Sequence, residues 1–256
     1  MNERVELRSA DEIARIREAS LVVQQVLAEV TAAAAPGVTT GELDRIAARA
    51  TAARGAKPAF LGYHGYPAVL CVSVNDEVVH GIPSDHRVLR EGDVVGLDFG
   101  VSLDGYFGDA ARTIPVGSVS PEAARLLDVG QEALRRAIAA ARPDARLGDI
   151  GFAVQQHVEA AGCSVVRDFV GHGIGRRLHE PPQVPNYGAP GTGLRLRPGM
   201  VLAIEPMVNA GGSEVRTLDD GWTAVTVDGS LSAHFEHTVA VTDDGPVILS
   251  QPPGGS

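Results

Sequence analysis

The stretch LREGDVVGLDFG, residues 89–100, has a counterpart in LRPGMVLAIEPM, residues 196–207, and this pair decides the fold. In both stretches a Leu-Arg pair, a glycine and an acidic residue keep the same spacing, and the two stretches are 107 residues apart. The same offset aligns Pro36 with Pro143. A unit of helices followed by strands that is used twice predicts an α+β domain with pseudo-twofold symmetry.

Capping signals mark where the helices of this repeat begin. Residues 9–12 and 39–42 have the spacing of capping boxes, and Ser120-Pro121 joins an N-cap residue to a proline at the first helical position. The first helix should end before Pro36-Gly37. The predicted helices therefore cover about residues 10–35, 40–54, 120–141 and 149–161.

Valine-rich segments predict the strands. The predicted strand regions are residues 66–79, 92–116, 199–208 and 234–242. The second region, GDVVGLDFGVSLDGYFGDAARTIPV, is typical of two strands joined at Ser102 to Gly105. We expect one catalytic domain over residues 1–250, built from two related halves at about 10–115 and 120–245, followed by a flexible tail at 251–256.

The composition of the chain argues against some binding partners and cellular locations. The chain has 256 residues, is 44% hydrophobic and carries a net charge of −10, and no basic patch favours direct binding of nucleic acid. The N-terminal residues lack the apolar segment of a signal peptide, and no apolar run is long enough to cross a bilayer. Cys71 and Cys163 have no paired spacing, which favours a reducing, cytoplasmic location.

Asp98 and Glu205 are acids at equivalent positions of the repeat, each in the middle of an apolar predicted strand. An ionised carboxylate in such surroundings is costly unless a partner or a metal compensates its charge. A strand edge that lets the acid reach water explains one such residue. Two acids at equivalent places in two halves favour a shared central site.

Asp109 follows Asp98 by eleven residues in the predicted hairpin. If the loop is Leu103-Asp104, Asp109 lies directly opposite Asp98, with the Cβ atoms about 5 Å apart. Like charges at that separation call for a divalent cation. A loop centred one residue away is expected to place the two acids on opposite faces.

His172 and Glu236 complete a set of five candidate metal ligands. His172 lies between Gly171 and Gly173 in DFVGHGIGRRLHEPPQ, residues 168–183, so we expect another group to approach the backbone there. A flexible loop with incidental histidines, and a solvent-facing acid at Glu236, are the alternatives. Four carboxylates and one imidazole are too many for a single catalytic zinc and suit a pair of Mn²⁺, Fe²⁺ or Co²⁺ ions. Such a pair polarises a carbonyl and activates water, which is the chemistry of hydrolysis.

The sequence resembles the type I methionine aminopeptidases over nearly its whole length. The matching motifs are GYHGYPAVLCVSVNDEVVHGIP, GDVVGLDFGVSLDGYFGDAART, VVRDFVGHGIGRRLHEPPQVPNY, PGMVLAIEPMVNAG and DGWTAVTVDGSLSAHFEHTVAVTD. The resemblance implies the pseudo-symmetric pita-bread fold, with an antiparallel sheet core and helices on its outer face. It also implies that Asp98, Asp109, His172, Glu205 and Glu236 bind the metals, with Asp109 and Glu236 bridging the two ions.

The resemblance further assigns catalytic and substrate-binding roles. His80, which pairs with His179 in the repeat at a slightly changed offset, would join it in donating hydrogen bonds to the scissile peptide. Glu205 would also shuttle a proton toward the leaving amine. The methionine side chain would enter a pocket lined by Tyr63, Tyr66, Cys71 and Trp222, although ordinary core packing is the alternative for any one of them. Leu178 departs from the family, in which phenylalanine often precedes the second histidine.

The function implied by this resemblance is metal-dependent removal of the initiator methionine from nascent chains whose second residue is small. The metal would be Co²⁺, Mn²⁺ or Fe²⁺, and a cytoplasmic monomer is expected, with the ribosome as a further partner. An X-Pro aminopeptidase of the same fold is the nearest alternative, although such proteins usually carry an additional N-terminal domain, for which the residues before about position 10 leave no room. A non-catalytic binding protein is a second alternative, although such relatives typically lose metal ligands.

Overall fold

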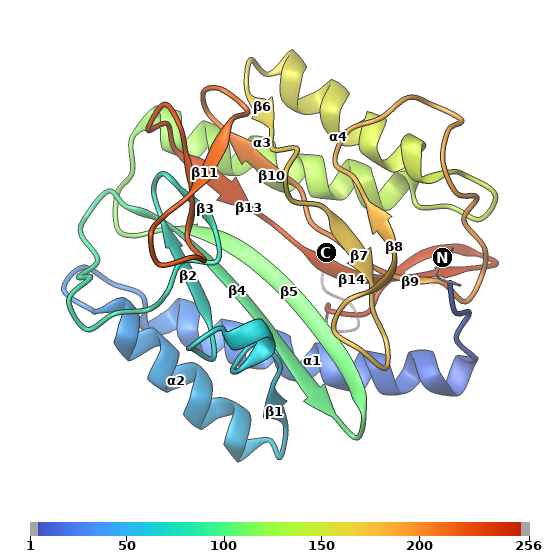
Figure 1. The fold of residues 1–256 in the computed structure, drawn as a ribbon, viewed down its shortest axis with the longest axis horizontal. Coiled ribbons are helices and arrows are strands. Elements are labelled where there is room, and N and C mark those ends of the chain that lie inside the picture. The colour runs from blue at the N-terminus through green and yellow to red at the C-terminus, as the bar shows by residue number, and fades with distance from the viewer. Residues whose placement is uncertain (1–4, 252–256) are drawn as a thin grey trace.

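Two helices accompany each half of the chain in the computed structural model, which describes residues 5–251. The helices are α1 (Ala10–Ala33), α2 (Thr40–Ala53), α3 (Pro121–Ala140) and α4 (Leu147–Ala160). Helices α1 and α2 lie along one side of the molecule and α3 and α4 along the opposite side, with the strands between them (Figure 1). The Ser9 hydroxyl accepts from the Glu12 backbone N–H while the Glu12 carboxylate accepts from the Ser9 N–H, which confirms the predicted capping box.

The strands pair in antiparallel ladders throughout the described residues. They are β1 (Lys57–Pro58), β2 (Cys71–Val74), β3 (Glu77–Val79), β4 (Val94–Leu103), β5 (Tyr106–Pro115), β6 (Ser164–Val165), β7 (Gly171–Gly173), β8 (Glu180–Val184), β9 (Val201–Ile204), β10 (Met207–Asn209), β11 (Val215–Thr217), β12 (Ala224–Thr226), β13 (Ser232–His234), β14 (His237–Thr242) and β15 (Gly245–Ile248). In one sheet β4 pairs with β1, β2 and β5, and in another the order is β15-β14-β9-β7-β8. Two smaller sheets have the orders β13-β10-β6 and β11-β12-β3, and the short helix η1 (Tyr63–Gly65) follows β1.

Backbone contacts recur at the offset of 107 residues that the sequence shows. Gly92 and Gly199 both have a φ of +92°, a left-handed conformation that glycine adopts without strain. The recurring contacts are the hydrogen bonds from Gly37 N to Leu89 O and from Asp144 N to Leu196 O, the bonds from Leu89 N to Val38 O and from Leu196 N to Ala145 O, and the bridges Thr39–Val88 and Arg146–Arg195. The helix-to-strand junction is therefore built in the same way in both halves, and the predicted α+β fold with pseudo-twofold symmetry is confirmed.

Each half buries its own core, and a third cluster lies where the halves meet. The first-half core packs α1 and α2 against β2, β4 and β5 through residues such as Leu27 and Leu97. The second-half core packs α3 and α4 around Ile150 and Leu202. The third cluster takes residues from both halves, among them Ile16, Phe60, Tyr66, Ile174 and Leu178. Phe60, Tyr66 and Leu178 of this shared cluster also line the cavity described below.

The two halves are joined by β5 and the segment that runs from the end of β13 into β14. The Glu236 backbone N–H donates to Ala111 O at 2.9 Å. Thr238 reinforces this contact, because its hydroxyl donates to Asp109 O at 2.7 Å and accepts from Asp109 N at 3.2 Å. Asp109 and Glu236, which are distant in sequence, are thus fixed side by side at the junction of the halves.

The prediction of continuous strands through Glu205 and Glu236 is wrong at both acids. Strand β9 ends at Ile204 and β10 starts at Met207, since Pro206 has no N–H for the ladder and the Asn186 side chain donates to Glu205 O instead. Strand β13 ends at His234 and β14 starts at His237, because the Glu236 N–H donates to Ala111 O of β5 and not to the strand that pairs with β13. Each carboxylate therefore leaves a strand end rather than a strand interior.

Smaller differences concern the boundaries of the prediction. Helix α4 begins at Leu147, two residues earlier than expected, since the Asp149 carboxylate accepts from the Arg146 N–H and caps the helix from its third position. Of the predicted flexible tail, residues 252–256 lie outside the described residues, as do residues 1–4 at the other end. Over residues 5–251, no helix has the length and apolarity to span a membrane.

Candidate metal centre

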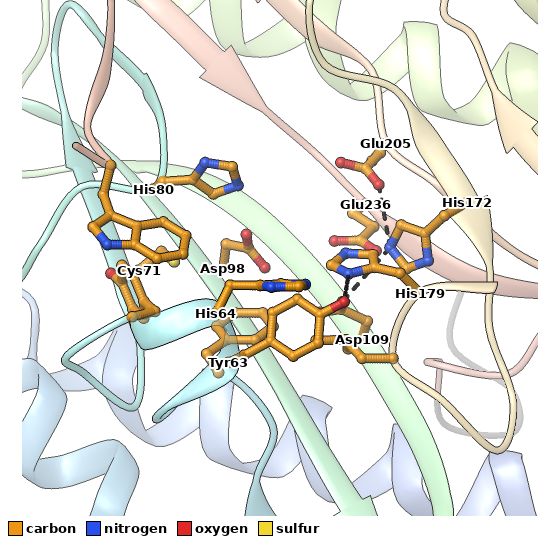
Figure 2. A pocket seen from close by; sticks show the side chains of 14 residues that line it. Tyr63, His64, Cys71, His80, Asp98, Asp109, His172, His179, Glu205 and Glu236 are labelled. Atoms are coloured by element: carbon orange, nitrogen blue, oxygen red, sulfur yellow. Dashed lines mark hydrogen bonds and ion pairs between the residues drawn. The ribbon is translucent and has the colours of Figure 1, made fainter. Parts of the chain in front are cut away.

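The five candidate metal ligands converge from both halves on one cavity (Figure 2). Asp98 comes from β4, Asp109 from β5, His172 from β7, Glu205 from the end of β9, and Glu236 from the junction of β13 and β14. The cavity has a volume of about 270 Å³ and also receives every other residue that the sequence predicted for the site. Its lining is Phe60, Tyr63, His64, Tyr66, Cys71, His80, Asp98, Asp109, His172, Leu178, His179, Glu205, Trp222 and Glu236.

The register of the β4–β5 hairpin differs from the prediction. The loop is Asp104-Gly105, both with positive φ, which suits a two-residue hairpin turn better than Leu103-Asp104. Asp98 is paired with Ala111, and Asp109 with Gly100, so the two acids are diagonal rather than directly opposed. They still share a face, because moving the loop centre by one residue shifts the pairing by two. The expectation that such a shift would separate the acids was therefore wrong.

The buried carboxylates fit a divalent cation. Asp109, His172 and Glu236 each offer a ligand atom, and these three atoms lie within 4.8 Å of one another. Glu205 Oε1 lies 3.5 Å from His172 Nε2. One buried oxygen of Asp98, of Asp109 and of Glu236 has no hydrogen-bond partner. Buried polar atoms of native proteins are almost always satisfied, so oxygens of this kind that face one cavity indicate a missing positive charge.

Burial governs the protonation of these acids. It raises the pKa of Asp98 to about 7 and holds the pKa values of Asp109, Glu205 and Glu236 well above the usual range. The neighbouring acids add to the effect, since the charge of Asp98 and of Glu205 raises the pKa of both Asp109 and Glu236. Without a cation these acids therefore keep their protons to a higher pH than free carboxylic acids do, and a bound cation would displace the protons.

His172 is oriented by its own strand. Its Nδ1 lies 2.9 Å from Gly173 O, which makes Nδ1 the donor and leaves the Nε2 lone pair facing the carboxylates. Burial lowers the pKa of His172 to about 3, so the ring is neutral and able to ligate a metal. The flanking glycines are explained by the sheet, because a Cβ on Gly171 would collide with Ala203 O and one on Gly173 with Pro181 O. The predicted close approach therefore comes from the neighbouring strands.

His80 and His179 reach the cavity from different halves. The Tyr63 hydroxyl lies 2.6 Å from His179 Nδ1, while the His80 ring packs edge-on against Phe169 at 5.3 Å. His80 has a φ of +61°, an unusual backbone conformation for a residue with a side chain. Burial lowers the pKa of His80 to about 4 and also lowers the pKa of His179. Both rings are therefore neutral at pH 7 and can donate one hydrogen bond each.

The remaining wall of the cavity is apolar and aromatic. Tyr66 and Trp222 pack edge to face with ring centroids 5.1 Å apart, and Cys71 is buried beside them. Leu178, the residue that precedes His179, lines this wall and is almost fully buried. Such a wall accepts an unbranched apolar side chain next to the polar cluster.

Sequence reasoning missed three residues around the cavity. Phe60 and His64 line the cavity, and the His64 ring packs edge-on against the predicted Tyr63, with centroids 4.5 Å apart. His234 is buried with its Nε2 3.6 Å from Glu205 Oε2. Its signal was present in HFEH, where His234 stands two residues before Glu236, the spacing that repeats a face along a strand.

Comparison with known proteins agrees with this architecture. The profile of metallopeptidase family M24 matches residues 14–243. The methionine aminopeptidase of Clostridium perfringens is 52% identical over 244 residues, 95% of this chain and 98% of that protein. Methionine aminopeptidase 1 of Bacillus subtilis is 51% identical over 240 residues, 94% and 96% of the two chains.

Comparison with solved structures also supports a relationship to the methionine aminopeptidases. The crystal structure of methionine aminopeptidase from Thermotoga maritima superimposes with a TM-score of 0.96 at 46% sequence identity. The match covers 97% of this chain and 100% of that one. Prolidase from Pyrococcus furiosus shares the fold alone, with a TM-score of 0.79 at 23% identity over 96% of this chain and 65% of that one. The expected pita-bread fold is confirmed. The chain belongs to metallopeptidase family M24, among its methionine aminopeptidases.

Proposed function

We propose that the protein is a dinuclear metallo-aminopeptidase that removes the N-terminal methionine from nascent chains whose second residue is small. The observation that carries this proposal is the placement of a cluster of buried acids and one neutral imidazole beside an aromatic pocket. The names of the relatives, which are methionine aminopeptidases at about half identity over nearly the whole chain, support the substrate class.

Two divalent ions, Co²⁺, Mn²⁺ or Fe²⁺, would be held by Asp98, Asp109, His172, Glu205 and Glu236. Asp109 and Glu236 would be the ligands shared by both ions, and their position side by side at the junction of the two halves supports this role. When bound, the ions supply Lewis-acid polarisation of a peptide carbonyl and lower the pKa of water. The unpartnered oxygens on three of these acids support the assignment.

The protein itself supplies hydrogen bonds and proton transfer. His80 and His179 donate to the carbonyl oxygen of the scissile peptide as it acquires negative charge, which is the contribution of an oxyanion hole. Their lowered pKa values favour this use of the neutral rings over acid catalysis. Glu205 moves a proton from the attacking water toward the leaving amine, and the position of its carboxylate in the cavity, 3.5 Å from His172 Nε2, supports this role.

The pocket selects the methionine side chain. Tyr63, Tyr66, Cys71 and Trp222 line the apolar wall, and a thioether makes favourable contacts with aromatic edges. Leu178 occupies less of this wall than a phenylalanine would. We propose that this leaves the pocket wider than in relatives that carry phenylalanine there.

The proposed setting follows from the substrate. Initiator methionine is exposed on nascent chains in the cytoplasm, so we place the protein there as a monomer that meets its substrates near the ribosome. The net charge of −10 disfavours direct binding of nucleic acid.

Hydrolysis of Met-Ala-Ser, Leu-Ala-Ser and Ala-Pro-Ser tests the proposal. The protein is stripped with EDTA and then restored with Co²⁺, Mn²⁺ or Fe²⁺. Metal-dependent release of methionine from Met-Ala-Ser alone is the expected result. Preference for Ala-Pro-Ser would transfer the protein to the X-Pro class, and inactivity with every metal would favour a non-catalytic binding protein.

A further inference from the structure

An N-terminal arm, residues 5–9, crosses from the first half to the loop that carries His179. The Arg8 backbone N–H donates to Gly199 O at 2.7 Å, which ties the arm to the second half. The Arg8 side chain is only 3% exposed and forms ion pairs with Glu6 at 2.6 Å and with Glu180. A guanidinium this deeply buried is costly unless its charge is well matched, so its position needs an explanation.

The carboxylate of Glu180 explains the buried position of Arg8, because it holds the loop of residues 175–180 in place through hydrogen bonds. One oxygen, Oε1, accepts from the backbone N–H groups of Arg176 at 2.8 Å and Arg177 at 2.9 Å. The other oxygen accepts from Arg8, and the Glu180 side chain is only 6% exposed. Glu180 directly follows His179 in the chain, so whatever fixes Glu180 also fixes the backbone of His179.

The loop is shaped around the Arg8 guanidinium. A Cβ on Gly175 would lie 2.6 Å from Arg8 Nε, so any side chain at that position would require the Arg8 guanidinium to move. Gly175 O in turn accepts from Phe107 N at 2.8 Å, which anchors the start of the loop on β5. The loop is therefore held at its start by β5 and at its end by Glu180, with Arg8 filling the space between them.

We infer that Arg8 is a positioning residue for hydrolysis: it fixes Glu180 and thereby keeps the His179 ring in place in the cavity. The inference rests on the proposed function, in which His179 donates a hydrogen bond to the substrate. The His179 ring contacts the Tyr63 hydroxyl through its Nδ1 and the His172 ring, whose centroid lies 4.2 Å away, and neither contact fixes the backbone from which the ring extends, so the direction of its other nitrogen also depends on the loop. Small displacements of a group that contacts the reacting atoms are costly in rate.

A double-mutant cycle tests the inference. Arg8→Met should lower kcat for Met-Ala-Ser by about tenfold or more, with KM and metal content nearly unchanged, since the ring is displaced but the metal ligands are not. Arg8→Lys should recover part of the loss because it restores the charge. In a His179→Ala background, Arg8→Met should lower kcat no further. Arg54→Met, which removes an arginine paired with Glu29 at the end of α2, is the matched control and should leave kcat unchanged.

Amide hydrogen exchange gives a readout that does not depend on activity. Arg8→Met should speed exchange at the Arg176 and Arg177 amides, which lose their shared acceptor when Glu180 is released. If Arg8→Met does not fold, Glu180→Gln replaces it in the same cycle, because it keeps the acceptor oxygen but removes the charge that pairs with Arg8.

The outcomes separate this inference from the proposed function. A wild-type protein that hydrolyses no peptide overturns the proposed function and the inference with it. An active wild type in which Arg8→Met leaves kcat and amide exchange unchanged overturns the inference alone. Equal losses of kcat in the wild-type and His179→Ala backgrounds also overturn it, because Arg8 would then act on the fold and not through His179.

Discussion

The two halves share the same arrangement of helices and strands but contribute different side chains to the central cavity. Asp98 and Glu205 are equivalent in the repeat, yet Asp98 lies inside the continuous strand β4 while Glu205 lies where β9 ends before Pro206. The first half supplies two acids from one hairpin, and the second supplies an imidazole and two acids from three separate segments. The helix-to-strand junctions keep the same hydrogen bonds in both halves, whereas the symmetry of the cavity is lost where β9 and β13 end.

The largest expected effect comes from removing a charge at the junction of the halves. Asp109→Asn should abolish measurable hydrolysis and weaken metal binding by at least about 100-fold, since even the residues that support metal ligands contribute 10–100-fold. Isothermal titration with Mn²⁺ or Co²⁺ measures the affinity, and Asp128→Asn, on the exposed face of α3, is the matched control. Undiminished binding of two ions by Asp109→Asn would show that this acid does not bridge them.

Substitution of His80 and of His179 compares the two halves directly, because each half contributes one of these histidines. His80→Ala and His179→Ala should each lower kcat by about 10²-fold, the cost of losing one donor to the developing oxyanion. Both variants should keep their metal, as measured by elemental analysis after gel filtration. If only one of them loses activity, the two halves contribute unequally to substrate binding, and unchanged kcat in both removes the proposed role.

The metal-free protein should lose stability as the pH rises, because the buried acids have raised pKa values in the folded state. Such groups stabilise the fold fully below their unfolded pKa, near 4, and this contribution is lost as the pH rises through the folded value, about 7 for Asp98. Each such group contributes up to about 1.4 kcal/mol per pH unit in this window. Urea denaturation of EDTA-treated protein between pH 4.5 and 7.5 measures the slope.

Asp98→Asn is the control for that slope, since the amide does not titrate. The slope should become smaller in this variant, and divalent metal should restore the stability of the wild type at pH 7. A metal-free wild type whose stability is constant across the window would mean that the acids are ionised and already compensated by groups other than a metal.

The smallest expected effect concerns the link between the aromatic wall and His179. Tyr63→Phe removes the hydroxyl that lies 2.6 Å from His179 Nδ1, and a hydrogen bond of this kind is worth about 0.5–1.5 kcal/mol. We therefore expect kcat to fall by roughly 2- to 13-fold at unchanged metal content. Tyr187→Phe, outside the cavity, is the matched control. A loss confined to KM would assign Tyr63 to the methionine pocket alone.

Several features of the fold and the site followed from local patterns. The capping box at Ser9, the helix after Ser120 and the β4–β5 hairpin are confirmed because they depend on neighbouring residues. The set of cavity residues followed from acids placed against the apolar pattern and from the resemblance to known peptidases. The hairpin register was missed because turn geometry, and not residue type alone, sets which residues pair.

The sequence by itself determined the repeat, the helices and the kinds of side chain that the site contains, because periodicity, capping and charge in an apolar segment are local properties. Pro206 marks the end of β9 in the sequence itself, but only the tertiary structure decided that Asn186 donates to Glu205 O and that β13 ends before Glu236, whose N–H donates to Ala111 O in a distant segment. It also decided how His172 is oriented and how Arg8 reaches Glu180. Contacts between residues far apart in the chain are set by the packing of the whole, and no local pattern encodes them.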